Sequence, residues 1–294
     1  GMSGGFGSFV RPITLSNANA FVNKPLEASI VLNTPFCMMR TIGNKPYNDP
    51  KYFKSEEEAD KIFRPVITPH PNGEFKRMNV VVFILESFSK EFVGELNKDL
   101  DGGSYKGFTP FLDSLIQHSL TFEYTFANGR KSIDAMPSVL SSISRFSEPY
   151  FLTEYSNNKV SGIAGELDKK GYYTAFFHGA PNGSMGFEAF AKVTGFKDYY
   201  GMTEYGNDSD YDGTWAIWDE EFFQFFANKM GTFKEPFMTA LFSASSHHPF
   251  HVPEKYKDIY KEDGIHPLHK CIRYSDNALR KFFDNAKKQP WYNN

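Results

Sequence analysis

The sequence predicts an α/β fold in which a mostly parallel central sheet is flanked by helices. Short apolar runs of strand length recur along the chain, and residues 80–85, Val-Val-Val-Phe-Ile-Leu, form the clearest of them. A continuous run rich in β-branched residues is typical of a strand buried on both faces. Segments with helical signals separate the runs, and this alternation favours a parallel sheet.

The regular pattern begins only after residue 76. Residues 1–76 are expected to form an irregular N-terminal arm, or a linker that follows a membrane segment, because five prolines interrupt them before residue 51. One helix is expected in this arm, over residues 55–63, where Glu and Lys are frequent. The domain proper is expected to span residues 77–294.

The first half of the domain is expected to continue with two helices and one further strand. Thr109-Pro110 marks a helix start, since Thr is a common N-cap residue and Pro suits the first helical position. That helix is expected to run to about residue 118. Residues 120–127 are predicted as a strand and residues 134–144 as a helix.

The second half of the domain shows the same alternation. Helices are expected over 161–170, 188–193, 219–229 and 267–287, and strands over 172–177 and 236–242. Gly171 ends the first of these helices, because glycine readily adopts the left-handed conformation that closes a helix. The last helix is amphipathic, with Ile272, Leu279 and Phe282 on its apolar side.

Composition excludes several classes of protein. Lys and Arg total 32 against 35 Asp and Glu, for a formal net charge of −3. Nucleic-acid binders usually show a clustered basic excess, so no nucleic-acid partner is expected. No apolar run approaches the roughly 18 residues that a membrane-spanning helix requires. The two cysteines, Cys37 and Cys271, stand in no metal or redox spacing, which excludes a disulfide scaffold and a structural zinc finger.

Polar residues with catalytic potential follow the predicted strands. In open α/β sheets, ligands bind beyond the carboxyl ends of the strands. Glu86 follows the first predicted strand, His178 follows the third, and the last leads into Ser-Ala-Ser-Ser-His247-His248-Pro. The second leads to Lys131-Ser132 at a predicted helix start. A hydroxyl at a helix N-terminus beside a lysine suits attack on a phosphate, because free backbone N–H groups favour anions.

Each candidate also has a purely structural interpretation. Glu86 would then cap a neighbouring helix or pair with a lysine, Ser132 would be a helix cap, and His178 a hydrogen-bonded core histidine. Adjacent His247 and His248 cannot both face one core, and we favour His247 because it is nearer the strand. The convergence of all four strand exits on one edge of the sheet favours a functional site.

The order and spacing of these segments resemble the alkaline phosphatase/sulfatase superfamily. Within it, the likeness is greatest to the branch of lipoteichoic acid synthases and phosphoglycerol transferases. The segments that carry the resemblance are Asn79–Ser87, Phe108–Asp113, Phe126–Ser132, Phe177–Gly179 and Ser246–Phe250.

The resemblance implies roles for several residues. Glu86 would be a metal ligand. Ser132 would stand where the family has a threonine nucleophile, binding the metal and attacking phosphorus to form a phospho-enzyme. His247 would contact the substrate phosphate or assist proton transfer, and His178 and Lys131 would line the same pocket. The implied cofactor is one divalent ion, namely manganese, magnesium or zinc, which would lower the pKa of the hydroxyl and neutralise charge on the phosphoryl group.

Two departures from the family pattern change what is expected. Ser132-Ile133-Asp134-Ala135-Met136 lacks the Pro and Arg of the sulfatase motif, so hydrolysis through formylglycine is not expected. Met185 and Phe187 stand where lipoteichoic acid synthases have a Trp and an Arg that hold glycerol phosphate. Asp212, Trp215 and Asp219 offer a replacement wall, and their alternative interpretation is a turn followed by a helix cap.

A third departure concerns the remaining metal ligands. The family's Asp-His pair follows one more strand, and the chain reaches Asn294 about where that strand would begin. We therefore expect a catalytic domain truncated at its C-terminus. Because two ligands hold an ion poorly, we also expect weak metal binding and little turnover by the chain as given.

The resulting hypothesis is transfer of a phosphoglycerol-type headgroup from a phospholipid to a glycan or lipid acceptor, through a phosphoseryl intermediate on Ser132. The domain would lie outside the cytoplasm, with membrane contact through a preceding segment of the parent protein. Two alternatives remain open: a sulfatase-like hydrolase or phosphodiesterase, in which water replaces the acceptor, and a non-catalytic sensor or scaffold with the same fold.

Overall fold

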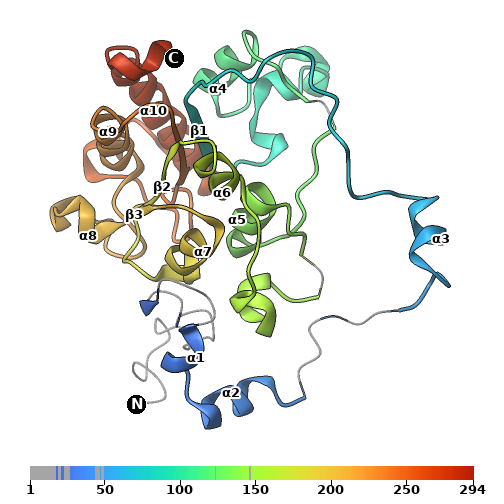
Figure 1. The fold of residues 1–294 in the computed structure, drawn as a ribbon. Coiled ribbons are helices and arrows are strands. Elements are labelled where there is room, and N and C mark those ends of the chain that lie inside the picture. Colours follow the sequence, from blue (N-terminus) through green and yellow to red (C-terminus); the bar gives the residue numbers. More distant parts are fainter. Residues whose placement is uncertain are drawn as a thin grey trace.

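The computed structural model describes residues 18, 21–22, 27–43, 47, 50–122, 124–145 and 147–294. Its centre is a four-stranded, entirely parallel sheet in the order β1-β4-β2-β3 (Figure 1). The strands are β1 (Val80–Ile84), β2 (Tyr173–His178), β3 (Asp198–Tyr200) and β4 (Phe237–Phe242). The predicted α/β class with a parallel sheet is confirmed.

Helices surround the sheet and also occur in the arm. Those of the domain are α4 (Pro110–Ile116), α5 (Ser132–Ser141), α6 (Ile163–Asp168), α7 (Phe187–Thr194), α8 (Met202–Tyr205), α9 (Asp219–Met230) and α10 (Leu268–Ala286). Those of the arm are α1 (Ala28–Val31), α2 (Thr34–Thr41) and α3 (Glu56–Asp60). The predicted helices of the domain therefore appear within a few residues of their expected bounds.

Two apolar clusters hold the helices to opposite faces of the sheet (Figure 1). On one face, α5 and α7 bury Met136, Leu140 and Phe190 in a cluster that includes Phe176 of β2. On the other face, α9 and α10 pack against Phe177, the next residue of the same strand. Successive strand side chains point to opposite faces, so one strand supplies both cores. Burial of so many rings is the main stabilising term, because each removes a large apolar area from water.

Two strand predictions require correction. Residues 120–127 do not form a strand: in the described part of this segment the backbone is irregular, and Leu120, Phe122, Tyr124 and Phe126 are exposed. No neighbouring strand accepts this segment in the described structure, because β1 pairs only with β4. Because β1 is an edge strand, most of its residues are half-buried and not buried on both faces as predicted.

The helix that begins at Ser132 differs from the prediction at both ends. Residues 134–144 were expected to be helical, but α5 starts two residues earlier and ends at Ser141. Ser142 adopts a left-handed conformation with a φ of 55°, which terminates the helix. Ser132 is thus the first helical residue, and it follows an irregular segment rather than a strand.

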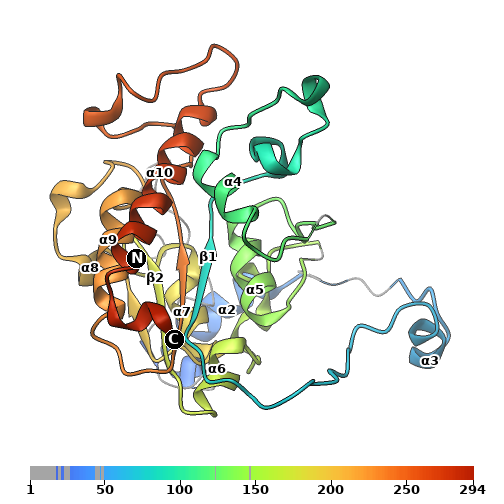
Figure 2. The same ribbon diagram turned by 90° about the horizontal axis from the view of Figure 1, so that it is seen from above.

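The arm contains more helix than its prolines suggest. Pro35 is accommodated in the first turn of α2, where a missing N–H costs nothing. The short helix α3 lies well away from the sheet, joined to it by an extended segment (Figure 2). No helix among the described residues is long and apolar enough to cross a membrane. The division of the chain at residue 76 remains a prediction.

A buried carboxylate connects α10 to α4. The side chain of Asp276 accepts hydrogen bonds from the N–H groups of Phe111, at 2.8 Å, and Leu112, at 2.9 Å, and so caps the start of α4. Burial raises the pKa of Asp276 from 3.8 to about 6, although the two N–H donors oppose this shift. The native state therefore holds a proton on Asp276 over a pH range in which the unfolded chain does not.

This proton should make stability depend on pH. A carboxyl group whose pKa is higher in the folded than in the unfolded chain stabilises the fold at pH values below its pKa in the unfolded chain. This contribution is lost as the pH rises through about 6. The free energy of unfolding of the wild type, relative to that of Asp276→Asn, should fall by about 2 kcal/mol between pH 4.5 and pH 7. Urea unfolding of both proteins at several pH values measures the difference. A difference that is constant, or that grows with pH, would contradict the assignment.

Candidate active site

The exits of β1 and β4 lie side by side at the carboxyl edge of the sheet. The N–H of Ser243 donates to the carbonyl of Ile84 at 3.0 Å, and the N–H of Glu86 donates to Ser243 Oγ at 2.8 Å. Ser87 has a φ of 61°, and its hydroxyl donates to Glu86 Oε1 at 3.1 Å. Glu86 is therefore held half-buried at this edge, beside the loop that carries His247.

The loop after β4 is anchored by Asp219, the first residue of α9. One carboxylate oxygen accepts hydrogen bonds from the N–H groups of Ala244, at 3.0 Å, and Ser245, at 3.2 Å. The other oxygen accepts from the hydroxyl of Ser275 in α10 at 2.7 Å, and the N–H of Asp219 donates to Ser245 Oγ at 2.8 Å. Burial raises the pKa of Asp219. This network ties α9 and α10 to the loop that ends at His247.

The hydrogen bonds of His247 determine its tautomer. Its Nδ1 lies 2.9 Å from the carbonyl oxygen of His248. A carbonyl only accepts hydrogen bonds, so Nδ1 carries the hydrogen, and in the neutral ring Nε2 keeps its lone pair. The ring lies against Trp215, with centroids 4.2 Å apart, and the Trp215 indole N–H donates to the same carbonyl of His248. His247 thus presents Nε2 in a fixed orientation.

Asp212 orients the tryptophan. Its Oδ1 accepts hydrogen bonds from the N–H groups of Thr214, at 2.7 Å, and Trp215, at 2.6 Å, which is the turn that the structural interpretation predicted. Asp212 and His247 also line one small pocket, together with Thr214, Trp218, Ser245, Pro249 and His251. The structure therefore brings Asp212, Trp215, His247 and His248 together.

His178 occupies a different environment. It is 2% exposed, its Nδ1 hydrogen-bonds the carbonyl of Phe242 at 3.0 Å, and its ring packs against Phe187 and Phe242. The hydrogen bond links the end of β2 to the end of β4. These surroundings agree with the structural interpretation of His178 as a hydrogen-bonded core histidine. Phe187 is fully buried in the same cluster, and Met185 packs against it, so the two positions that replace the family's Trp and Arg support the core.

Ser132 and Lys131 lie at the start of α5. Lys131 is the N-cap residue of this helix, and Ser132 is its half-buried first residue. Ser132 therefore does not act as the helix cap that the structural interpretation proposed. The far end of α5 lies by the start of α6 and the end of α7, because an added Cβ at Gly162 would meet both Ser141 Oγ and Thr194. Helix α5 therefore leads from Ser132 to the place where α6 begins and α7 ends.

Sequence reasoning missed the residue that fixes the start of this helix. Asp134 is 4% exposed, and its Oδ2 pairs with Arg145 at 3.1 Å. An added Cβ at Gly129 would collide with the Asp134 side chain, so the loop before Ser132 packs directly on this carboxylate. The only sequence signal was an acidic residue in the first turn, which is common in helices.

A metal site does not follow from the described residues alone. Across residues 50–122, 124–145, 147–294 and the described parts of the arm, no group of three or more His, Cys, Asp or Glu side chains is placed to hold an ion. Glu86 and Ser132 would supply two donors, whereas metal sites usually need four or more. The donor set of these residues thus does not fit a complete catalytic metal centre.

Comparison with known proteins identifies the class. The family model described as Sulfatase matches residues 78–294, and the chain belongs to this family. A solved protein of the alkaline phosphatase superfamily from Vibrio parahaemolyticus is similar, with a TM-score of 0.65 and 28% identity over 74% of this chain and 52% of that one. The lipoteichoic acid synthase LtaP from Listeria monocytogenes shares the fold, with a TM-score of 0.61 and 24% identity over 72% and 53% of the two chains.

Curated relatives narrow the resemblance to one branch. The chain is 26% identical to the lipoteichoic acid synthase-like YvgJ of Bacillus subtilis, over 76% of this chain and 36% of that protein. It is also 26% identical to the lipoteichoic acid synthase of Staphylococcus aureus, over 87% of this chain and 41% of that protein. The chain thus spans about two fifths of the length of these relatives. The resemblance to the lipoteichoic acid synthase branch is confirmed.

Titration with Mn²⁺ or Zn²⁺ tests the incomplete donor set. With Glu86 and Ser132 as the two candidate donors among the described residues, the chain should bind either ion with a dissociation constant above roughly a micromolar, because two donors do not replace an ion's hydration shell. Isothermal calorimetry measures this directly, with Glu86→Gln as the matched variant. Sub-micromolar affinity that Glu86→Gln abolishes would show that this chain completes a metal site around Glu86.

Proposed function

We propose that this domain transfers a phosphoglycerol-type headgroup from a phospholipid to a glycan or lipid acceptor. The observation that carries the proposal is the carboxyl edge of the sheet, where Glu86 adjoins the loop of His247, in a sulfatase-family chain related to lipoteichoic acid synthases. Transfer of phosphoryl headgroups is the activity that these relatives support at the level of the family.

Ser132 is the proposed nucleophile. Its Oγ would attack the phosphorus of the phospholipid, and the bond from phosphorus to the diacylglycerol oxygen would break. Diacylglycerol would leave with a proton, and phosphoglycerol would remain as a phosphodiester on Ser132. A hydroxyl of the acceptor would then attack the same phosphorus and release the serine. The position of Ser132 at the start of α5 supports this role, since backbone N–H groups there favour an anionic phosphate.

His247 is the proposed proton-transfer group. Its Nδ1–H is engaged by the carbonyl of His248, so Nε2 is the atom that can accept a proton or, once protonated, donate to a phosphate oxygen. Asp212 and Trp215 support the imidazole by fixing the ring beside it. Lys131, exposed next to Ser132, and His248, exposed next to His247, would contribute positive charge or a hydrogen bond to the substrate.

Glu86 is the proposed first ligand of a divalent ion, which would be manganese, magnesium or zinc. When bound, such an ion would neutralise phosphate charge and lower the pKa of a nearby hydroxyl. Further ligands would have to join Glu86 and Ser132 for this chemistry. The phospholipid donor places the reaction at a bilayer, so we propose that the domain works outside the cytoplasm on a membrane-anchored parent protein.

Replacement of the nucleophile tests the proposal. In the full-length protein, Ser132→Ala should reduce headgroup transfer by at least about a thousandfold, because no other hydroxyl would stand at the phosphorus. Transfer is measured as radiolabelled headgroup incorporated into the acceptor, alongside free headgroup released into water. Release without incorporation would favour the hydrolase alternative.

Ser138→Ala serves as the control for this experiment. Ser138 lies on the same helix, and its hydroxyl is satisfied by the carbonyls of Asp134 and Ile143, so its loss should leave transfer nearly unchanged. Circular dichroism and thermal unfolding establish that both variants are folded. Full transfer by a folded Ser132→Ala protein would exclude Ser132 as the nucleophile.

A further inference from the structure

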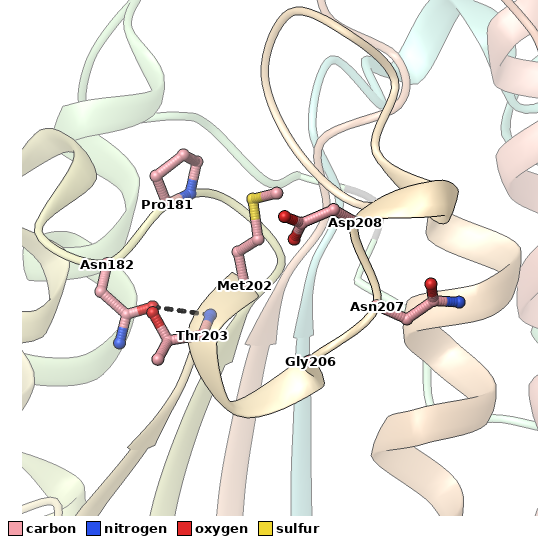
Figure 3. Close-up of a pocket in the computed structure, with 7 residues that line it drawn as sticks. All are labelled: Pro181, Asn182, Met202, Thr203, Gly206, Asn207 and Asp208. Carbon is pink, nitrogen blue, oxygen red and sulfur yellow. Dashed lines mark hydrogen bonds between the residues drawn. The ribbon is translucent and has the colours of Figure 1, made fainter.

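A second pocket lies at the exits of β2 and β3. It is a hollow that opens widely to solvent, with a volume of about 700 Å³, and Figure 3 shows the residues that line it. One wall is the loop after β2, with Pro181 and Asn182. The opposite wall comes from α8 and the turn that follows it, and contains Met202, Thr203, Gly206, Asn207 and Asp208. Neither the sequence analysis nor the proposed chemistry at Ser132 uses this pocket.

The walls of the pocket are held by their own hydrogen bonds. The N–H of Met202 donates to the carbonyl of Ala180 at 3.1 Å, and the N–H of Thr203 donates to Asn182 Oδ1 at 3.2 Å (Figure 3). The Asn182 amide group donates in turn to Glu204 at 3.0 Å. These bonds fasten α8 to the loop after β2. The pocket is thus preformed, and a ligand need not order its walls.

Two glycines shape the chain around the pocket. An added Cβ at Gly201 would meet the Asn182 side chain, so a larger residue at the exit of β3 would displace Asn182. Gly206 has a φ of 75°, ends α8 and turns the chain toward Asn207. The Asn207 side chain accepts a hydrogen bond from the N–H of Ser209, at 3.2 Å, and stabilises that turn.

The absence of basic side chains from its described lining distinguishes this pocket from that of His247. No Lys, Arg or His is among the described residues that line it, and its single ionisable group is the Asp208 carboxylate. An anionic phosphate would be repelled there. The pocket of His247 instead contains two imidazoles, those of His247 and His251, beside the carboxylate of Asp212. The carboxylate, amide and hydroxyl groups of the second pocket suit a neutral ligand rich in hydroxyls.

One loop connects the two pockets. Residues 207–218 contribute Asn207 and Asp208 to one pocket and Asp212, Thr214 and Trp218 to the other. The loop is fixed to the sheet by the N–H of Ile217, which donates to the carbonyl of Gly179 at 2.9 Å. It is closed on itself by the N–H of Trp218, which donates to the carbonyl of Asp210 at 3.0 Å. The two pockets are therefore neighbours along one rim.

We propose that the second pocket binds the acceptor, through neutral hydroxyl groups such as those of a sugar or another polyol. This inference rests on the proposed function, which requires an uncharged nucleophilic hydroxyl to reach a phosphate bound near Ser132. Asp208 accepts hydrogen bonds from ligand hydroxyls, and the Thr203 hydroxyl both donates hydrogen bonds to them and accepts hydrogen bonds from them. Met202 contacts the carbon skeleton of the ligand. Under the proposed function the donor phosphate lies near Ser132, and the lack of basic side chains in the described lining of the second pocket keeps an anionic group out of it.

Binding of simple probes tests the proposal without any turnover. Methyl α-glucopyranoside and glycerol are titrated into ¹⁵N-labelled protein, and glycerol 3-phosphate serves as the anionic probe. Methyl glucoside or glycerol should shift the amide signals of Thr203, Gly206 and Asp208 with millimolar affinity. Asp208→Asn should weaken this binding about tenfold, because a charged acceptor is lost. Asp258→Asn, at an exposed carboxylate outside the pocket, should bind as the wild type does.

The outcomes separate this inference from the proposed function. If the neutral probes shift these amides and Asp208→Asn weakens the effect, the pocket is a polyol site even if Ser132→Ala proves active. The inference is wrong if glycerol 3-phosphate binds there more tightly than the neutral probes. It is also wrong if neither neutral probe shifts these amides at a concentration about 100-fold above a millimolar dissociation constant. Equal binding by wild type and Asp208→Asn would also overturn the assigned contact.

Discussion

The carboxylate of Asp219 is the constraint on which the arrangement of the site depends. It is buried at the start of α9 and accepts hydrogen bonds from two backbone N–H groups after β4 and from Ser275 of α10. Loss of an acceptor in such a network would leave buried donors unpaired, at a cost of about 1–3 kcal/mol each. The loop that presents His247 is therefore held by two helices that the apolar core already fixes to the sheet.

Most of the fold was predictable because its elements carry local signals. The apolar runs at β1, β2 and β4 and the amphipathic pattern of α10 determine where these elements form. Residues 120–127 show the limit of such reasoning, because a strand also needs a neighbouring strand. The strand β3 has only three residues, too few for a pattern, and it forms because β2 offers a free edge.

The site was predictable where residues follow a strand directly, and less so where partners lie far apart in sequence. Glu86 and His247 follow β1 and β4, so their common edge could be inferred from the parallel topology. The contacts of Asp219 with Ser275 and of Asp134 with Arg145 join different segments, and neither has a sequence signature. His178 illustrates the converse, since a histidine at a strand exit lies in the core when aromatic side chains surround it.

The central claim is that Ser132 forms a covalent bond to phosphorus. Its most direct test is mass spectrometry of the full-length protein quenched in acid after incubation with phosphatidylglycerol in the absence of acceptor. The account predicts a phosphoglycerol adduct on the peptide that contains Ser132, which disappears when acceptor is added. An adduct on another residue, or continued headgroup transfer with no adduct on any residue, would contradict it.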